Sequence, residues 1–266
     1  MSPPRPIVLA IAASDPTGGA GLQADLLTLA ALGCHPVSVL TAITAQDTHG
    51  VKQVMPLDAE WVSRQAAVLL RDVRVAAIKI GVLGSAANVA AVAAVLDAQP
   101  GVPVVLDPVL ASGRGDALAD EALIAVLRSQ LLPRVTVLTP NLPEARRLAG
   151  DAAAGREACA RALMELGCRH VLVTGTHDGT DEVVNTLFAR EGVLREDRWP
   201  RLPGEFHGSG CTLASALAAL IALGRALPDA AREAQDFTWQ ALAGGFAAGR
   251  GQAIPDRFFR ARAPQP

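Results

Sequence analysis

A glycine-rich stretch that ends in a cysteine is the segment of this chain best suited to chemistry. Residues 207–212 have the sequence HGSGCT and open a long Ala/Leu-rich run that predicts a helix. A glycine-rich helix start presents free backbone N–H groups and the positive end of the helix dipole, which stabilise an anion such as a transferred phosphoryl group. A serine-hydrolase role for Ser209 is excluded, because the G-x-S-x-G pattern of such a nucleophile is absent.

Cys211 lies at the terminus of this predicted helix. A thiol in that position commonly has its pKa lowered below the free value of about 8.5, which makes Cys211 a candidate general base for a hydroxyl. The alternative is a small cysteine that fills a helix contact, which is the most frequent fate of a lone cysteine. The other cysteines form no C-x-x-C pair, so neither a zinc site nor a disulfide framework is expected.

Acidic and amide side chains follow two of the later apolar runs. Asp107 ends one run, and Asn141 and Glu144 are spaced i, i+3 at the start of a predicted helix after another. Together they can bind hydrated Mg²⁺ against phosphates, since this ion typically keeps several waters and takes few carboxylates. The alternative for Asn141 and Glu144 alone is a helix N-cap with its capping-box partner.

A second glycine-rich loop, residues 14–21, follows the first apolar run and has the sequence SDPTGGAG. It is neither a Walker A loop nor a G-x-G-x-x-G loop, but its glycines allow backbone N–H groups to approach a ligand closely. The alternative is a tight turn. Asp25 follows on the next predicted helix, where it either complements the helix dipole or points into the ligand site.

Gln46 lies at the end of the second apolar run. Its amide offers a donor and an acceptor, which suits the edge of an aminopyrimidine, where a ring nitrogen lies beside an exocyclic amine. The alternative is an amide that caps loop backbone.

Short apolar runs that alternate with amphipathic stretches must position these residues. The runs are predicted strands at 7–13, 37–45, 76–80, 102–106, 135–138 and 170–174. The predicted helices lie at 21–32, 59–71, 85–97, 117–131, 142–149, 156–166, 208–223 and about 229–249. Residues 182–188 and 193–199 predict an antiparallel hairpin that turns near 190–192. Continuous apolar strands joined by helices indicate an α/β fold with a mostly parallel sheet covered on both faces. No linker or repeat divides residues 1–266, so we expect a single domain, with a loosely held tail from Pro255.

Composition excludes several classes of partner. The chain has 266 residues, 50% apolar content, a formal net charge of −2 and no tyrosine, so it offers neither the basic surface nor the stacking platforms of a nucleic-acid binder. No stretch has the apolar length of a membrane span. The apolar run at 7–13 suits a buried first strand better than an export signal, because prolines precede it. We therefore expect a cytoplasmic protein with no membrane or nucleic-acid partner.

Three of these segments together resemble the ribokinase-like superfamily, and within it the hydroxymethylpyrimidine/phosphomethylpyrimidine kinases of thiamine biosynthesis. They are SDPTGGAGLQAD at 14–25, LTPNLPEA at 138–145 and GSGCT at 208–212, and the resemblance extends from about residue 7 to about residue 249. It implies a three-layer α/β/α sandwich, ATP and Mg²⁺ as cofactors, and a homodimer. It also implies two phosphorylations, first of the hydroxymethyl group of 4-amino-5-hydroxymethyl-2-methylpyrimidine and then of the resulting monophosphate.

The resemblance also implies roles for individual residues. Cys211 matches the catalytic base, with Gly208, Ser209 and Gly210 as the anion hole. The matching substrate-site residues are Gln46, which bonds the pyrimidine, the nearby Asp25, and the lining residues Ala20, Val82 and Val109. The residues at the Mg-ATP end are Asp107 and Glu144 for the metal, and Asn141, Thr174, Thr176 and His177 for the nucleotide.

Two positions depart from the family pattern. Thr174 stands where many relatives place a lysine that touches the nucleotide phosphates, which leaves phosphate binding to Mg²⁺, the helix terminus and His177. Ala13 stands where a glycine is common beside the substrate, which alters the shape of the site.

Two other functions fit the same residues. A kinase of this architecture that acts on pyridoxine or pyridoxal also uses a cysteine base, and Gln46 only weakly favours the aminopyrimidine. A non-catalytic domain that senses the pyrimidine would keep the binding site but lose Asp107, Glu144 or Cys211. All three residues are present, and no DNA-binding segment is attached.

Overall fold

The computed structural model describes residues 5–111 and 118–261 of the chain. Its central sheet has eight strands in the order β10-β9-β8-β7-β6-β5-β1-β2. The parallel strands are β1 (Ile7–Ala12), β2 (His35–Leu40), β5 (Ala77–Ile80), β6 (Val104–Leu106), β7 (Val137–Leu138) and β8 (His170–Val173). The antiparallel hairpin is formed by β9 (Glu182–Ala189) and β10 (Gly192–Pro200). The predicted sheet and its edge hairpin are confirmed.

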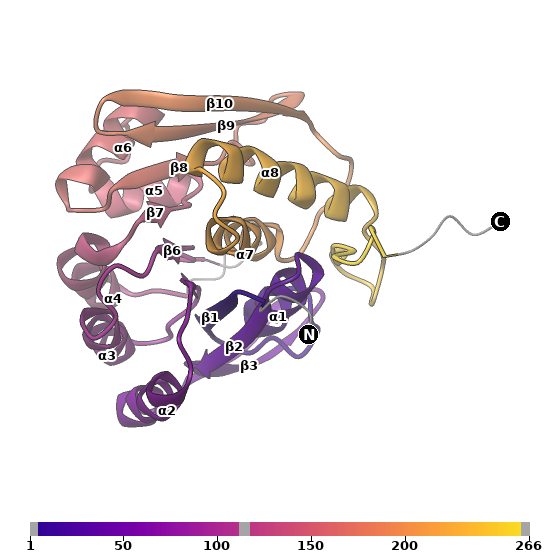
Figure 1. Ribbon diagram of the computed structural model, residues 1–266. Coiled ribbons are helices and arrows are strands. Elements are labelled where there is room, and N and C mark those ends of the chain that lie inside the picture. Colours follow the sequence, from indigo (N-terminus) through magenta and orange to yellow (C-terminus); the bar gives the residue numbers. More distant parts are fainter. Residues whose placement is uncertain (1–4, 112–117, 262–266) are drawn as a thin grey trace.

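Helices cover both faces of the sheet (Figure 1). One face is covered by α1 (Gly21–Ala31), α7 (Ser209–Ala222) and α8 (Leu227–Ala243). The other is covered by α2 (Ala59–Asp72), α3 (Ala86–Asp97), α4 (Glu121–Val126), α5 (Leu142–Ala149) and α6 (Arg156–Glu165). The expected three-layer α/β/α sandwich is therefore confirmed.

Each face of the sheet carries its own apolar cluster, which explains why the parallel strands are continuously apolar. In β1, Leu9 and Ile11 pack toward α2, α3 and the helices beside them, whereas Val8 and Ala10 pack toward α1, α7 and α8. Every residue of α7 from Cys211 to Leu220 is buried, because this helix lies between the sheet and its neighbours α1 and α8. The start of α7 is thereby fixed against the middle of the sheet.

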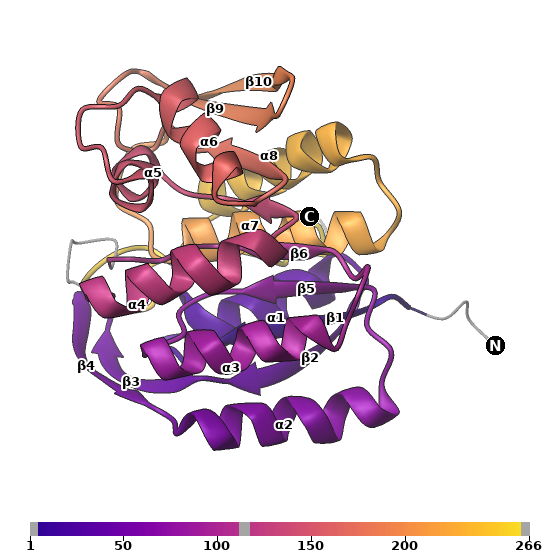
Figure 2. The same ribbon diagram turned by 90° about the vertical axis from the view of Figure 1, so that its left-hand side faces the viewer.

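The second apolar run was predicted as one strand, and this is wrong. The chain leaves the central sheet at Thr41, and β3 (Ala42–Asp47) pairs antiparallel with β4 (Gly50–Pro56), which the sequence did not predict, in a separate two-stranded sheet. Figure 2 shows β4 leading into α2. Gln46 consequently lies on this small sheet and not on the central one.

Three further boundaries differ from the prediction. The described part of the helix predicted at 117–131 begins at Glu121, and it continues as a π-helical turn (Leu127–Leu131) and a 3-10 turn (Leu132–Arg134). The predicted start at Ala117 lies outside the described residues. α8 ends at Ala243, several residues early, because Gly244 and Gly245 follow it. The tail from Pro255 was expected to be loosely held, but in its described part Asp256 and Arg257 are buried, and residues 262–266 lie outside the described residues.

Among the residues that the structure describes, no helix has the length and apolar character needed to cross a membrane.

Candidate active site

The segments with candidate chemistry meet at the carboxyl edge of the parallel strands. The glycine loop follows β1, Val82 follows β5, Asp107 follows β6 and Asn141 follows β7. Ligands of open α/β sheets bind beyond this edge, where the strand ends converge. The start of α7 lies at the same place, because its first turn approaches Asp107.

Two glycines bring the start of α7 into close contact with its neighbours. Gly208 is the N-cap residue with φ 82°, and a Cβ atom there would lie 1.9 Å from the carbonyl oxygen of Gly19, so only glycine fits. A Cβ atom on Gly210 would lie 3.5 Å from Asp107 Oδ2. The first turn of α7 therefore packs on the glycine loop on one side and faces the Asp107 carboxylate on the other.

Cys211 belongs to this first turn, and its thiol is buried in the protein. It interacts with the Asp107 carboxyl, and the Gly21 backbone N–H donates to its sulfur. Burial raises the pKa of the Cys211 thiol to about 12, and the charge of Lys79 only partly offsets this effect. The expected lowering of the thiol pKa by the helix terminus is therefore wrong, because loss of hydration on burial outweighs the helix dipole.

Asp107 and Glu144 form an acidic pair beside this thiol. Burial raises the pKa of Asp107 to about 6, and burial followed by repulsion from Asp107 raises the pKa of Glu144 to about 8. Asp107 Oδ2 is buried and has no hydrogen-bond partner. Two acids that resist losing their protons, one with an unpaired oxygen, form an environment that a cation would stabilise.

Asn141 and Glu144 also form the capping box that the sequence offered as the alternative. The Glu144 N–H donates to Asn141 Oδ1 at 2.9 Å, and the Asn141 N–H donates to Glu144 Oε2 at 3.0 Å. The remaining oxygen, Oε1, accepts from the Leu110 N–H at 3.3 Å. The cap fixes the Glu144 carboxylate close to Asp107, so the structural role and a role in the site coexist.

The glycine loop is a closed turn around Asp15, and the N–H groups of residues 17–20 are bonded within it. The N–H groups of Thr17 and Ala20 donate to the Asp15 carboxylate at 2.8 and 2.6 Å. The Gly18 N–H donates to the Asp15 carbonyl oxygen, and the Gly19 N–H donates to Thr17 Oγ1. The tight turn is therefore confirmed, and a contact between this loop and a ligand stays a prediction.

His207 links this turn to Gln46, and the sequence did not single out His207 or Asp15. His207 Nε2 lies 2.8 Å from Asp15 Oδ2 and 3.3 Å from Gln46 Nε2. Burial alone would raise the pKa of Asp15, but hydrogen bonds from His207, Ala20 and Thr17 lower it well below its usual range. The ionised Asp15 carboxylate fixes the His207 imidazole. The imidazole in turn contacts Gln46, the residue predicted to bind the pyrimidine.

Asp25 does not reach the surface of the site. Its side chain is completely buried and accepts hydrogen bonds from Lys79 Nζ at 2.6 Å and from Ser215 Oγ at 2.8 Å. The carboxylate is thus directed into the protein interior, and the predicted place of Asp25 near the substrate stays a prediction. The sequence analysis assigned no role to Lys79. A lysine inside the apolar strand β5 was nevertheless a signal of a buried charge that needs a partner.

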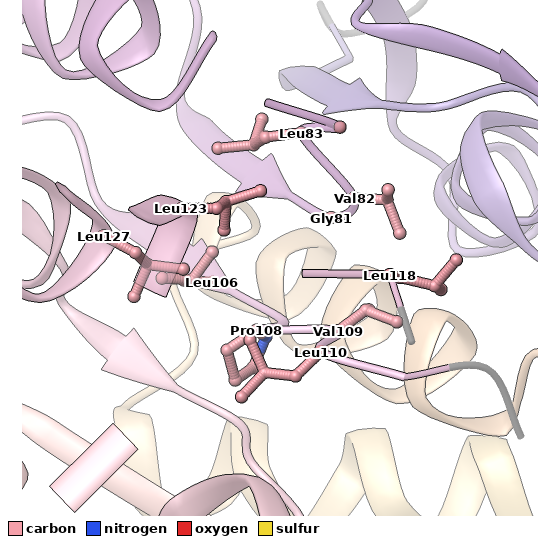
Figure 3. Close-up of a pocket in the computed structure, with 11 residues that line it drawn as sticks. Gly81, Val82, Leu83, Leu106, Pro108, Val109, Leu110, Leu118, Leu123 and Leu127 are labelled. Atoms are coloured by element: carbon pink, nitrogen blue, oxygen red, sulfur yellow. The ribbon is translucent and has the colours of Figure 1, made fainter. Parts of the chain in front are cut away.

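Val82 and Val109 line an apolar recess next to the acids (Figure 3). The recess lies between the ends of β5 and β6 and the side of α4, and its other side chains are leucines and one proline. Ala20, the third predicted lining residue, is half-buried in the glycine loop and is not part of this recess. The recess has no polar side chain and a volume of only about 10 Å³, so Val82 and Val109 are placed at the edge of the site without forming a ligand cavity.

The residues predicted for the nucleotide lie further along the same edge. Thr174 follows β8, and its N–H donates to the Pro140 carbonyl oxygen at 2.9 Å, so it lies beside Asn141. Thr176 and His177 are exposed on the loop that continues from it. The Gly175 N–H in this loop donates to Asn185 Oδ1 at 3.0 Å, which fixes the loop to β9.

Comparisons with known proteins agree with this geometry. A family model described as phosphomethylpyrimidine kinase matches residues 15–256. The hydroxymethylpyrimidine/phosphomethylpyrimidine kinase of Streptomyces coelicolor is 43% identical over 251 residues, covering 92% of this chain and 92% of that protein. The thiamine biosynthesis bifunctional protein ThiED of Geobacter sulfurreducens is 40% identical over 243 residues, covering 90% of this chain and 49% of that protein.

Solved structures share the fold. The pyridoxal kinase from Staphylococcus aureus, solved in complex with AMP-PCP and pyridoxal, superposes with a TM-score of 0.87 and 28% sequence identity. The match covers 98% of this chain and 96% of that one. The structural likeness therefore extends over nearly the whole molecule.

Proposed function

The chain belongs to the phosphomethylpyrimidine kinase family, and from this premise we propose that it transfers the γ-phosphoryl group of ATP to 4-amino-5-hydroxymethyl-2-methylpyrimidine and then to the resulting monophosphate. It is a small-molecule kinase that uses ATP, and its place in thiamine biosynthesis agrees with the name of the bifunctional relative. The continuous eight-stranded sheet supports treating the chain as one kinase domain.

The single observation that carries the proposal is the position of the Cys211 thiol. The thiol is buried in the first turn of α7 and interacts with the Asp107 carboxyl. The Glu144 carboxyl lies close to Asp107. A proton acceptor, an anion-stabilising helix start and a cation-binding acid pair thus occur together. Phosphoryl transfer from a nucleotide to an alcohol requires these three elements.

In the proposed reaction, the substrate lies between Gln46 and the start of α7. Its hydroxyl oxygen forms the new bond to the γ-phosphorus, the bond from that phosphorus to the leaving oxygen of ADP breaks, and Cys211 accepts the hydroxyl proton. The N–H groups of Ser209, Gly210 and Cys211 lie in the first turn of α7, where they have no helical partner and face the charge that develops on the phosphoryl oxygens. Positioning and charge stabilisation supply most of the acceleration.

We propose Asp107 and Glu144 as the residues that hold Mg²⁺. The unpaired, buried Oδ2 of Asp107 and the raised pKa values of both acids fit a divalent cation. Within the described residues, no cluster of three or more metal-ligating side chains occurs, so an ion held by these two acids would take its other ligands from water and phosphate. Bound there, the ion would neutralise phosphate charge and offset the charge of Asp107, which adds to the effect of burial on the pKa of the Cys211 thiol.

We also propose a homodimer in the cytoplasm. Ile43 and Met55 lie opposite each other on β3 and β4 and are 41% and 51% exposed, which supports an apolar contact with a second copy. All four cysteines are free, which supports a reducing compartment. Sedimentation of the wild type and of Ile43→Lys tests the first point, because only the wild type should form a dimer.

The test of the proposed function is ATP consumption by the purified protein with Mg²⁺ and one acceptor at a time. We expect turnover with the hydroxymethylpyrimidine and with its monophosphate, and the Cys211→Ala variant reports the background ATP hydrolysis. Turnover with neither acceptor would exclude the proposal.

Pyridoxal phosphorylation is the second candidate, because a pyridoxal kinase superposes on nearly the whole chain. The higher identity to the pyrimidine kinase, 43% against 28%, favours the pyrimidine. A higher kcat/KM for pyridoxal than for the pyrimidine in the same assay would reverse this order. The non-catalytic sensor is set aside, since the relatives are kinases and all three reactive side chains meet at the site.

A further inference from the structure

A buried arginine from the end of the described chain reaches into the wall of the proposed site. Arg257 is 3% exposed, and its side chain makes three hydrogen bonds. Nε donates to Thr212 Oγ1 at 3.1 Å, Nη1 to the Gly18 carbonyl oxygen at 3.2 Å and Nη2 to the Gly19 carbonyl oxygen at 2.5 Å. One guanidinium therefore connects the glycine loop after β1 with the first turn of α7.

Two of the three residues that accept from Arg257, Thr212 and Gly19, adjoin groups that the proposed reaction uses. Thr212 follows Cys211 directly, and its hydroxyl donates to the Gly208 carbonyl oxygen at 2.8 Å while accepting from Arg257. The Gly19 carbonyl oxygen, the acceptor of the shortest of the three bonds, is also the atom against which Gly208 packs. Arg257 thus acts on the two surfaces whose contact fixes the start of α7.

The segment that carries Arg257 is docked by contacts of its own. The Asp256 N–H donates to the Ala241 carbonyl oxygen at 2.8 Å, and the Phe259 ring lies 5.3 Å from the Phe237 ring between centroids. The Ala253 carbonyl oxygen accepts from the His207 N–H at 2.9 Å. Because these contacts do not involve the guanidinium, a substitution of Arg257 removes the connection without releasing the segment.

An arginine suits this position better than any other residue. Its planar fork presents several donors at fixed directions and keeps its charge when buried. Burial lowers the pKa of Arg257, and the nearby carboxylates of Asp25 and Asp15 partly offset this effect. Loss of the fork would leave two loop carbonyl groups without their donors, and buried acceptors without partners are costly.

We propose that Arg257 is a positioning residue that sets the distance between the Gly18–Gly19 turn and the first turn of α7, and thereby the alignment of Cys211 with the substrate hydroxyl. This inference rests on the proposed kinase function. It assigns to Arg257 an effect on kcat through position, and no direct contact with either substrate.

The experiment compares Arg257→Ala with Arg260→Ala, a matched control in the same segment whose side chain is 55% exposed. We measure kcat, KM for each substrate and the melting midpoint. Arg257→Ala should lower kcat by about 10²-fold, the size expected for a misplacement of about 1 Å, with KM for ATP unchanged. Added guanidinium ion should restore part of this loss in Arg257→Ala only, and Arg260→Ala should keep wild-type kcat.

Several outcomes would overturn the inference: a wild-type kcat in Arg257→Ala, a loss fully explained by its unfolded fraction, or an equal loss in Arg260→Ala. If Arg257→Ala does not fold, Arg257→Lys carries the test, because one ammonium group cannot reach the three acceptors together. A wild-type kcat in Arg257→Lys would then overturn it. An inactive wild type would instead contradict the proposed function itself.

Discussion

Lys79 Nζ lies 2.6 Å from Asp25 Oδ1, and neither side chain has any exposed surface. This ion pair connects β5 with α1 directly beneath the proposed site. The charge of Lys79 lowers the pKa of both Asp107 and Cys211, while the charge of Asp25 raises both. The pair therefore connects the two elements that lie under the site and shifts the pKa values of Asp107 and Cys211.

Breaking this pair should destabilise the protein strongly. Asp25→Asn leaves the Lys79 ammonium buried without its counter-charge, which typically costs about 3–5 kcal/mol of unfolding free energy. The exposed pair Arg64–Glu60 is the control, since Glu60→Gln should cost about 0–1 kcal/mol. Denaturant unfolding of both variants measures the difference. Equal stability of Asp25→Asn and the wild type would contradict the role of the pair.

Replacement of Cys211 should separate chemistry from binding. Cys211→Ala removes the proton acceptor and should lower kcat by about 10²–10⁴-fold, while both KM values stay near those of the wild type. Cys34→Ala is the control, because Cys34 is also a buried thiol but contacts the Ala219 carbonyl oxygen away from the acids. Steady-state kinetics of both variants is the measurement, and near-normal turnover by Cys211→Ala would remove the cysteine from the mechanism.

Gln46 and His207 should act together on pyrimidine binding. Gln46→Ala removes the proposed hydrogen bonds to the ring edge, and His207→Ala removes the side chain that contacts the Gln46 amide. Both should raise KM for the pyrimidine and leave KM for ATP unchanged. Gln53→Ala, an exposed amide on the neighbouring strand β4, should change neither. Unchanged affinity of Gln46→Ala for the pyrimidine, measured by calorimetry, would refute its assignment.

The order and rhythm of the elements could be predicted from the sequence because each depends on local patterns. A buried parallel strand such as β1 is apolar on both faces and is recognisable by itself, and the Asn141–Glu144 cap is a signal within four residues. Once the sheet is taken as parallel, strand ends such as Asp107 and Asn141 must converge. The proximity of the acids therefore follows from topology alone.

The remaining features depend on contacts between distant segments, for which the sequence has no local signal. Arg257 pairs with Gly18 and Gly19 across most of the chain, and Lys79 meets Asp25 only when β5 lies beside β1. The pKa of Cys211 was predicted in the wrong direction for the same reason. The helix terminus is visible in the sequence, whereas the burial that dominates the pKa is not.

The raised pKa values of the two acids predict how pH and Mg²⁺ act on stability. The pKa of Glu144 is about 8 in the folded protein against an ordinary value of 4.5, and that of Asp107 is about 6 against 3.8. From pH 4.5 to about 8, the folded state holds the Glu144 proton more tightly than the unfolded state does, and the same is true of Asp107 from pH 3.8 to about 6. The free energy of unfolding should therefore fall as pH rises through these ranges. Glu144→Gln keeps the capping box, since glutamine also accepts the Asn141 N–H, and should make this fall shallower.

Mg²⁺ competes with the same protons, so its effect should have the opposite dependence on pH. Because a bound cation favours ionised carboxylates, the rise in melting midpoint that Mg²⁺ causes should be larger above the folded pKa of Glu144 than below that of Asp107. Asp107→Asn and Glu144→Gln should reduce this rise, whereas Asp72→Asn, an exposed acid at the end of α2, should retain it. Thermal melts across this pH range with and without Mg²⁺ provide the measurement. The same rise in all four proteins would show that the ion does not bind at Asp107 and Glu144.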